Sequence, residues 1–206
     1  MGQYYRALLI SDDGYINIGV PYDFDNGYKL MEHSWIGNSF VDAVAEMLYE
    51  QPMRLAWIGD YATDLLTPYE FGNGYIKSKK EFIPFYHLAW DDEGGKKRIT
   101  KESVNQAGIK TPYDFIINET KGCFIDINKY INANKENNGW CIHPLPLLTS
   151  IGNGLGGGDF GAEYVGIENV GTWAFDRIST SNLRPCNIEE VEYRFAETEQ
   201  EDIFPF

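Results

Sequence analysis

Cysteine and histidine are scarce in this sequence, and their spacing excludes several kinds of site. The 206 residues include three cysteines and three histidines. The cysteines form no Cys-x-x-Cys pair, so neither a zinc knuckle nor a disulfide framework is indicated. The histidines show none of the short spacings typical of metal ligands, such as His-Glu-x-x-His, so we predict no metal site.

Basic residues are few relative to acidic ones. There are 17 Lys and Arg residues against 31 Asp and Glu residues, which gives a formal net charge of −14 and a pI of about 4.5. A charge of this sign repels nucleic acid phosphates and anionic lipids at long range. We therefore expect no direct binding of nucleic acid. A well-solvated surface explains the acidity, and docking of a basic protein partner is the alternative.

Long apolar runs are also missing. No stretch approaches the roughly 18 consecutive apolar residues of a membrane-spanning helix. The N-terminus, Met-Gly-Gln-Tyr-Tyr-Arg, has no basic segment followed by an apolar core, so it does not resemble a secretory leader. We therefore expect a soluble, cytoplasmic protein that does not interact with membranes.

Hydrophobic and aromatic residues are plentiful by contrast. They make up 43% and 15% of the chain, so disorder is not expected for its bulk. The length fits one domain. We predict a single α+β domain over residues 1–195, followed by an acidic, loose tail over residues 196–206.

The hydrophobic pattern predicts a mainly antiparallel sheet with long loops. Residues 4–11 and 15–19 flank Asp12-Asp13-Gly14, and residues 113–118 and 123–127 flank a second turn that ends in glycine, so two hairpins are expected. Further strands are predicted over residues 28–35, 53–58, 140–151 and 188–195.

One principal amphipathic helix is predicted, over residues 39–50. Ser39 can cap it, with Asp42 three residues later, and an apolar stripe follows that ends before Pro52. Residues 128–139 are polar and are predicted to be a linker.

A glycine-rich segment over residues 152–161 is the most unusual stretch, because six of its ten residues are glycine. Ordering so many glycines is costly. The segment contains Gly-x-Gly-x-x-Gly, but no helical pattern follows, so a dinucleotide-binding fold is not indicated. Consecutive glycine amides can form an anion-binding concavity, whereas a flexible or tightly turned loop is the simpler alternative.

We predict that this glycine segment helps to enclose a ligand. Aromatic side chains can supply stacking faces for such a ligand, although core packing is their commoner role; Trp57 and Trp173 are considered with them. The predicted ligand-binding residues are Gly154, Gly156, Gly157, Gly158, Trp35 and Tyr61.

A second set of residues could carry acid–base chemistry. His33 and His143 each lie in an apolar run, and either could pair with Asp60 or Asp159, because a carboxylate orients an imidazole and raises its basicity. The alternative is that both histidines are buried structural residues. No Gly-x-Ser-x-Gly or Gly-Lys-Ser/Thr pattern supports a serine hydrolase or a P-loop.

Several segments together carry a resemblance. The opening Met-Gly-Gln-Tyr-Tyr, residues 29–38 and 57–62, and His143-Pro-Leu-Pro-Leu-Leu-Thr149 joined to the glycine segment resemble a family of uncharacterised proteins from bacteria and their phages. The similarity spans most of the chain. It implies a single domain and a bacterial or phage origin, but no catalytic residue or cofactor.

Three functions follow as hypotheses. The leading one is a soluble protein that binds a small polar ligand, nucleotide-like in character, at the glycine segment. The second is a hydrolase that uses a His/Asp acid–base pair. The third is an acidic protein-interaction module, such as an inhibitor of a host defence protein. No cofactor is indicated by the sequence.

Overall fold

The computed structural model describes residues 2–49, 51–62, 89–90, 96–102 and 113–197. These residues form an open, mixed sheet with few helices, as expected for the α+β class. The strands of this sheet are β1 (Tyr5–Ile10), β2 (Ile16–Gly19), β3 (Met53–Gly59), β4 (Lys97–Ile99), β5 (Phe115–Asn118), β6 (Cys123–Asp126), β7 (Ser150–Ile151), β9 (Arg177–Ser181) and β10 (Glu189–Glu190).

The strand order is β10-β6-β5-β9-β3-β1-β2-β4, and β7 also pairs with β3. The longest pairings, β1 with β2 and with β3, and β5 with β6 and with β9, are antiparallel. Three short pairings are parallel: β2 with β4, β3 with β7, and β6 with β10. The two predicted hairpins are confirmed as β1–β2 and β5–β6.

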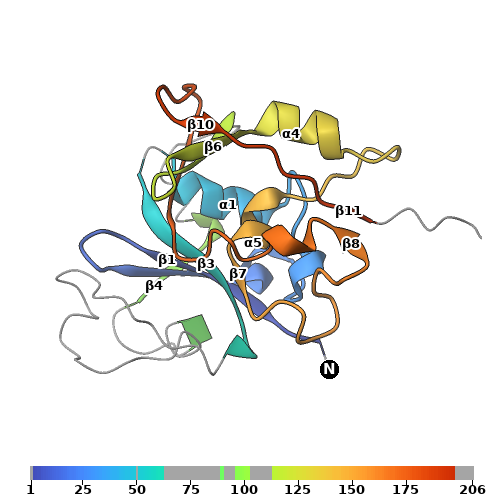
Figure 1. Cartoon of the computed structure of the whole chain (residues 1–206). Coiled ribbons are helices and arrows are strands. Elements are labelled where there is room, and N and C mark those ends of the chain that lie inside the picture. The colour runs from blue at the N-terminus through green and yellow to red at the C-terminus, as the bar shows by residue number, and fades with distance from the viewer. Residues whose placement is uncertain (1, 50, 63–88, 91–95, 103–112, 198–206) are drawn as a thin grey trace, which may run out of the picture.

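The central strands β1 and β3 are buried on both faces. Alternate residues of each strand enter two separate hydrophobic clusters, so that Ala7 and Leu9 pack on one face while Leu8 and Ile10 pack on the other. Figure 1 shows helices α1 (Ser39–Met47) and α5 (Pro144–Leu148) beside the β1–β3 pair, and α4 (Ile127–Asn134) beside β6 and β10. The larger cluster lies under α1 and α5.

Helix α1 confirms the predicted amphipathic helix, with two corrections. Its N-cap is Asn38, whose Oδ1 accepts the backbone N–H groups of Phe40 and Val41 at 3.0 and 3.3 Å. Asn is among the best N-cap residues, so Ser39 is displaced into the first turn. The helix ends at Met47, and residue 50 lies outside the described part of the chain.

The strand predicted over residues 140–151 is wrong for most of its length. Residues Pro144–Leu148 form helix α5, and only Ser150–Ile151 form a strand. Pro144 and Pro146 both lie in the first turn, where backbone N–H groups have no partner within the helix, so their missing donors cost nothing there.

The strand predicted over residues 28–35 is also absent; the segment contains the short 3-10 helix η2 (Leu30–Glu32). Hydrogen bonds between nearby side chains and the backbone stabilise this turn, in place of the backbone hydrogen bonds between strands of a sheet. The Glu32 carboxylate accepts the N–H of Lys29 at 3.0 Å, and the Ser34 hydroxyl donates to the Leu30 carbonyl at 2.6 Å.

The predicted linker over residues 128–139 contains helix α4. Asp126 caps it by accepting the N–H of Lys129 at 3.1 Å, and Ile127, Tyr130 and Asn134 are its buried residues. The helix was missed because its exposed positions are rich in asparagine and lysine.

The C-terminal segment differs from the predicted strand over residues 188–195 and from the predicted tail. Within residues 188–197, only Glu189–Glu190 (β10) and Ala196–Glu197 (β11) pair as strands, and β11 joins β8 (Tyr164–Val165) in a two-stranded sheet. The first two residues of the predicted tail are therefore structured, and residues 198–206 lie outside the described part. In the described residues, no helix is long and apolar enough to cross a membrane.

Candidate functional site

His33 is a buried core residue with both ring nitrogens occupied. Its Nε2 accepts the indole N–H of Trp57 at 3.0 Å, so the ring hydrogen lies on Nδ1, which donates to the Gly27 carbonyl at 3.1 Å. Its ring also packs edge-on against Phe40. Burial lowers the pKa of His33 to about 4, so the imidazole is neutral at pH 7.

His143 is likewise buried, at the start of α5. Its Nδ1 accepts the N–H of Leu145 at 3.1 Å and caps the helix, which leaves Nε2 to donate to the hydroxyl oxygen of Tyr113. Burial lowers the pKa of His143 to about 3. The ring nitrogens of both histidines thus bond to backbone groups and to aromatic side chains, Trp57 for His33 and Tyr113 for His143.

The two candidate aspartates hydrogen bond to residues near the N-terminus and not to the histidines. Asp60 Oδ1 accepts the N–H of Tyr4 at 3.0 Å, and its own N–H donates to the Tyr4 carbonyl at 2.9 Å. Asp159 is bonded to Gln3 at 3.1 Å. In the described residues, no hydrogen bond joins either aspartate to His33 or His143, so the His/Asp pair of the sequence hypothesis is not formed.

The glycine segment is closed by its own carboxylate. Asp159 Oδ2 accepts the backbone N–H groups of Gly154, Leu155 and Gly156 at 2.9, 3.1 and 3.1 Å. The concavity expected for an external anion is therefore filled by Asp159. Burial raises the pKa of this carboxyl, against the opposing effect of the three amides.

This closed loop holds the N-terminal segment. The Nε2 of the buried Gln3 side chain donates to the Gly152 carbonyl at 2.5 Å and to Asp159 at 3.1 Å, and the Gln3 amide also contacts the Tyr5 hydroxyl. A Cβ added to Gly156 would lie 2.4 Å from the Gln3 backbone nitrogen, which no side chain tolerates. Gly156 is thus required by a contact within the chain.

The other three predicted glycines have different surroundings. Gly154 has a φ of +88° and open space around it, whereas the nearest atom to a Cβ on Gly157 would be 3.9 Å away. Gly158 has a φ of +87°, and a Cβ there would lie 2.5 Å from the Lys29 side chain. Its carbonyl accepts the N–H of Met31 at 2.9 Å.

The candidate aromatic residues divide between core and surface. Trp57 and Trp173 are fully buried, so they are core residues. Trp35 is half-buried and forms a backbone bridge with Ile142. Tyr61 follows Asp60 beyond the end of β3 and is 37% exposed.

An aromatic hollow of about 470 Å³ lies next to the glycine segment. We call it the tyrosine hollow, and it is lined by Tyr4, Gly27, Tyr28, Lys29, Glu32 and Trp90. The rings of Tyr4 and Tyr28 meet edge to face at 5.7 Å, and Tyr22 stacks on Tyr28 at 6.2 Å. Its volume is within the range of small-molecule sites.

Backbone and cation contacts position these rings. The Tyr28 carbonyl accepts the N–H of Tyr5 at 2.8 Å, which ties the loop to the start of β1. The guanidinium carbon of Arg6 lies 4.3 Å from the centre of the Trp90 ring, an attractive cation–π geometry. Tyr5 and Arg6 of strand β1 thereby hold Tyr28 and Trp90 in the lining of the hollow.

Lys29 links the tyrosine hollow to the glycine segment. A Cβ added to Gly158 or to Gly2 would meet the stem of Lys29, and the Nζ of Lys29 lies 3.9 Å from Glu32 Oε1. Both charged side chains are about 40% exposed, at 38% and 43%, so this ion pair is weak. The amine and Oε1 of the carboxylate are therefore available at the rim as hydrogen-bonding groups, while Oε2 accepts the backbone N–H of Lys29.

Sequence reasoning missed the residues of the tyrosine hollow. Tyr4 and Tyr28 fall within predicted strands, and no sequence pattern singles out Trp90. The available signal was the density of tyrosine near the N-terminus, at positions 4, 5, 15, 22 and 28. Among the described residues, no group of three or more His, Cys, Asp or Glu side chains could hold a metal ion.

The comparisons with known proteins return nothing: no protein-family model, no curated protein and no solved structure matches the chain. The resemblance to bacterial and phage proteins stays a prediction.

Proposed function

We propose that the protein binds a small polar molecule with a planar ring, of the nucleoside type, in the tyrosine hollow. The observation that carries this proposal is the meeting of three aromatic side chains with one amine and one carboxylate around a 470 Å³ hollow. The rings would stack on the planar part of the ligand, and Lys29 and Glu32 would hydrogen bond to its polar edge.

The exposure of the rings supports a binding role over a packing role. Tyr4, which lines the hollow, is 46% exposed, and Tyr22, which stacks on Tyr28 outside the lining, is 69% exposed, while most large aromatic residues of the described chain are in the core. Tyrosine clusters at a surface are typical of binding sites, because each ring offers a large contact area at a low cost in conformational entropy.

The charge of the protein favours a nucleoside over a nucleotide. The net charge of −14 repels phosphate, and the single amine at the rim is already opposed by Glu32. The glycine amides cannot serve as a phosphate cradle, because Asp159 occupies them. We therefore place the ligand beside the glycine segment, and assign its amides to the protein's own architecture.

Calorimetric titration with adenosine, guanosine, cytidine and uridine tests the proposal. We expect saturable binding of at least one nucleoside, and we expect Tyr28→Ala to weaken it by about 1–3 kcal/mol, the usual contribution of one stacked ring. Tyr15→Ala is the matched control, because Tyr15 is 64% exposed in the β1–β2 turn and does not line the hollow. Equal affinities of the two variants, or no binding of any nucleoside, would reject it.

The hydrolase hypothesis receives no support from the geometry. A general base needs a partner that orients it and access to substrate, whereas both histidines are neutral, buried and committed to other bonds.

A further inference from the structure

Glu32 holds a carboxylate at a fixed place in the lining of the tyrosine hollow. Its backbone N–H donates to the Lys29 carbonyl at 3.0 Å, and its Oε2 accepts the N–H of Lys29, also at 3.0 Å. The carboxylate lies close against Gly27, because a Cβ added to that glycine would be 2.1 Å from Oε2. Gly27, Lys29 and Glu32 all line the hollow. The backbone of this loop therefore sets the position of the carboxylate.

Lys29 places an amine beside this carboxylate. Its Nζ lies 3.9 Å from Glu32 Oε1, which is beyond the distance of a direct hydrogen bond. Both groups keep hydrogen-bonding capacity, since the amine can donate, Oε1 can accept twice, and Oε2 can accept once more besides the Lys29 N–H. The hollow therefore offers a ligand one donor next to several acceptor positions.

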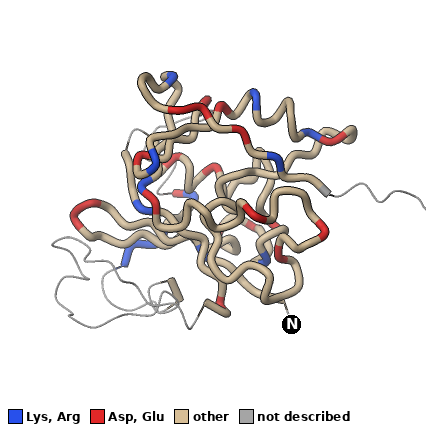
Figure 2. The backbone as a smooth tube through the Cα atoms, viewed as in Figure 1, with Lys and Arg blue, Asp and Glu red and all other residues tan. Residues whose placement is uncertain are grey.

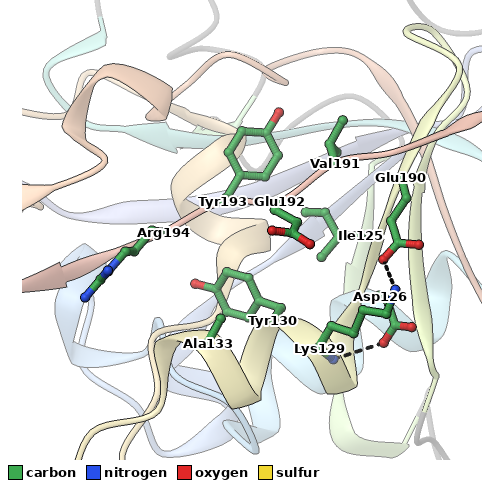
Figure 3. A pocket seen from close by; sticks show the side chains of 10 residues that line it. All are labelled: Ile125, Asp126, Lys129, Tyr130, Ala133, Glu190, Val191, Glu192, Tyr193 and Arg194. Atoms are coloured by element: carbon green, nitrogen blue, oxygen red, sulfur yellow. Dashed lines mark hydrogen bonds and ion pairs between the residues drawn. The ribbon is translucent and has the colours of Figure 1, made fainter.

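A second hollow, of about 340 Å³, lies beside helix α4 and differs in this respect. Figure 3 shows its lining, in which Lys129 bonds to Glu190 at 2.5 Å. Arg184 bonds to the same carboxylate, also at 2.5 Å, so Glu190 is shared by two cations. Glu192 also lines that hollow and is exposed, but it does not line the tyrosine hollow. It supplies a carboxylate with which Glu32 can be compared.

We propose that the tyrosine hollow is selective for guanine and that Glu32 determines this specificity. Guanine selectivity rests on the proposed binding of a nucleoside at this site. One edge of guanine carries the acceptor O6 followed by two donors, N1–H and the N2 amino group. O6 would accept from the Lys29 amine, while both donors would bond to the Glu32 carboxylate.

The other bases match this pair of side chains less completely. On the corresponding edge, adenine and cytosine each place one amino donor beside a ring acceptor, and uracil has one donor between two acceptors. Guanine therefore makes one more hydrogen bond to the carboxylate than the other bases do. Hydrogen bonds to a charged acceptor are stronger than those between neutral groups.

Calorimetric titration of the whole protein with guanosine and inosine isolates this bond, because inosine has O6 and N1–H but lacks the N2 amino group. We expect guanosine to bind at least about tenfold more tightly than inosine, which corresponds to one hydrogen bond to a charged acceptor. Equal binding of inosine, or tighter binding of another nucleoside, would overturn guanine selectivity and leave the nucleoside site standing. Failure of every nucleoside to bind would reject both.

Glu32→Gln tests the assigned residue. Glutamine retains an oxygen that can accept the Lys29 N–H, so the variant should unfold at about the same denaturant concentration as the parent protein. Its amide NH₂ opposes the donors of guanine, so the affinity for guanosine should fall to about that for inosine. The matched control Glu192→Gln should keep the guanosine preference. An unchanged preference in Glu32→Gln, or an equal loss in Glu192→Gln, would overturn the role of Glu32.

Discussion

Asp159 explains how a loop with so many glycines is ordered. Its carboxylate gathers three consecutive amides and the Gln3 side chain, which replaces the water that these donors would otherwise bind. The conformational cost of ordering the glycines is offset within the chain itself. The glycines permit close approach of the loop to residues 2–5.

Two adjacent glycines in this loop should respond oppositely to alanine. Gly156→Ala places a methyl group on the Gln3 backbone and should lower the free energy of unfolding by about 1–3 kcal/mol. Gly157→Ala has room and a permissive φ, so it should be neutral or raise stability by about 0.4–1 kcal/mol. Urea unfolding of both variants measures the difference. Equal effects would show that the loop does not clasp Gln3.

Asp42 should destabilise the protein at neutral pH. Burial in α1 raises the pKa of its carboxyl from 3.8 to about 6. The folded state thus holds the proton more tightly than the unfolded state, so stability falls as pH rises through this window. After discounting for partial exposure, Asp42→Asn should raise the free energy of unfolding by about 1 kcal/mol near pH 7 and by almost nothing near pH 4.

The comparison for Asp42 is Asp13→Asn, a change of one charge in the exposed β1–β2 turn. It corrects for the general benefit of reducing a large negative charge. Stability curves from about pH 4 to pH 8 for the three proteins decide the matter. A gain for Asp42→Asn that does not depend on pH would contradict the assignment of a raised pKa.

At the scale of elements, the sequence predicted what local patterns determine. The β1–β2 and β5–β6 hairpins and helix α1 follow from alternation, turn residues and an apolar stripe, and each is observed. Helix α5 was missed because proline was interpreted only as a strand breaker, although its placement in a first turn is also favourable.

The candidate site depended on contacts that no local pattern encodes. Gln3 meets Asp159 across 156 residues of sequence, and this contact converts an apparent anion-binding loop into a closed structural one. His33 and Trp57 are 24 residues apart in sequence and meet only in the core. The sequence singles out this loop, but no local pattern shows that its amides are occupied by Asp159.

The start of helix α1 offers a test of element boundaries. Asn38→Ala removes the oxygen that accepts two backbone N–H groups and should cost about 0.5–2 kcal/mol of stability. Ser39→Ala removes a hydroxyl whose contacts with Phe24 and Asn26 are long, at 3.3 Å, and should change stability by less than about 0.5 kcal/mol. Thermal unfolding of the pair gives the comparison, and a reversed order would restore Ser39 as the cap.

For the whole molecule, the distribution of charge matters more than its sum. Figure 2 shows acidic residues on loops at opposite sides of the described chain, with basic residues between them. The net charge of −14 repels anions at long range. Docking of a basic protein partner stays a prediction, and such an association should weaken steeply with salt.

This field gives a prediction about salt and ligand charge. Raising the ionic strength from about 0.01 M to about 0.5 M shortens the Debye length from about 30 Å to below 10 Å, so the repulsion of phosphate should fade. The dissociation constant of adenosine 5′-monophosphate should therefore fall several-fold, while that of adenosine changes little. Calorimetry at several salt concentrations tests this. Weaker binding of the monophosphate at high salt would show instead that Lys29 attracts the phosphate.

The location of the ligand is the most direct test of the central claim, that the tyrosine hollow is the nucleoside site. A ¹H–¹⁵N NMR shift map of the protein with the nucleoside that binds best would provide it. We predict shifts at Tyr4, Tyr28, Lys29, Glu32 and Trp90, with the hollow beside helix α4, lined by residues 125–133 and 190–194, unaffected. Shifts confined to that hollow, or to residues 152–161 without the tyrosines, would contradict the claim.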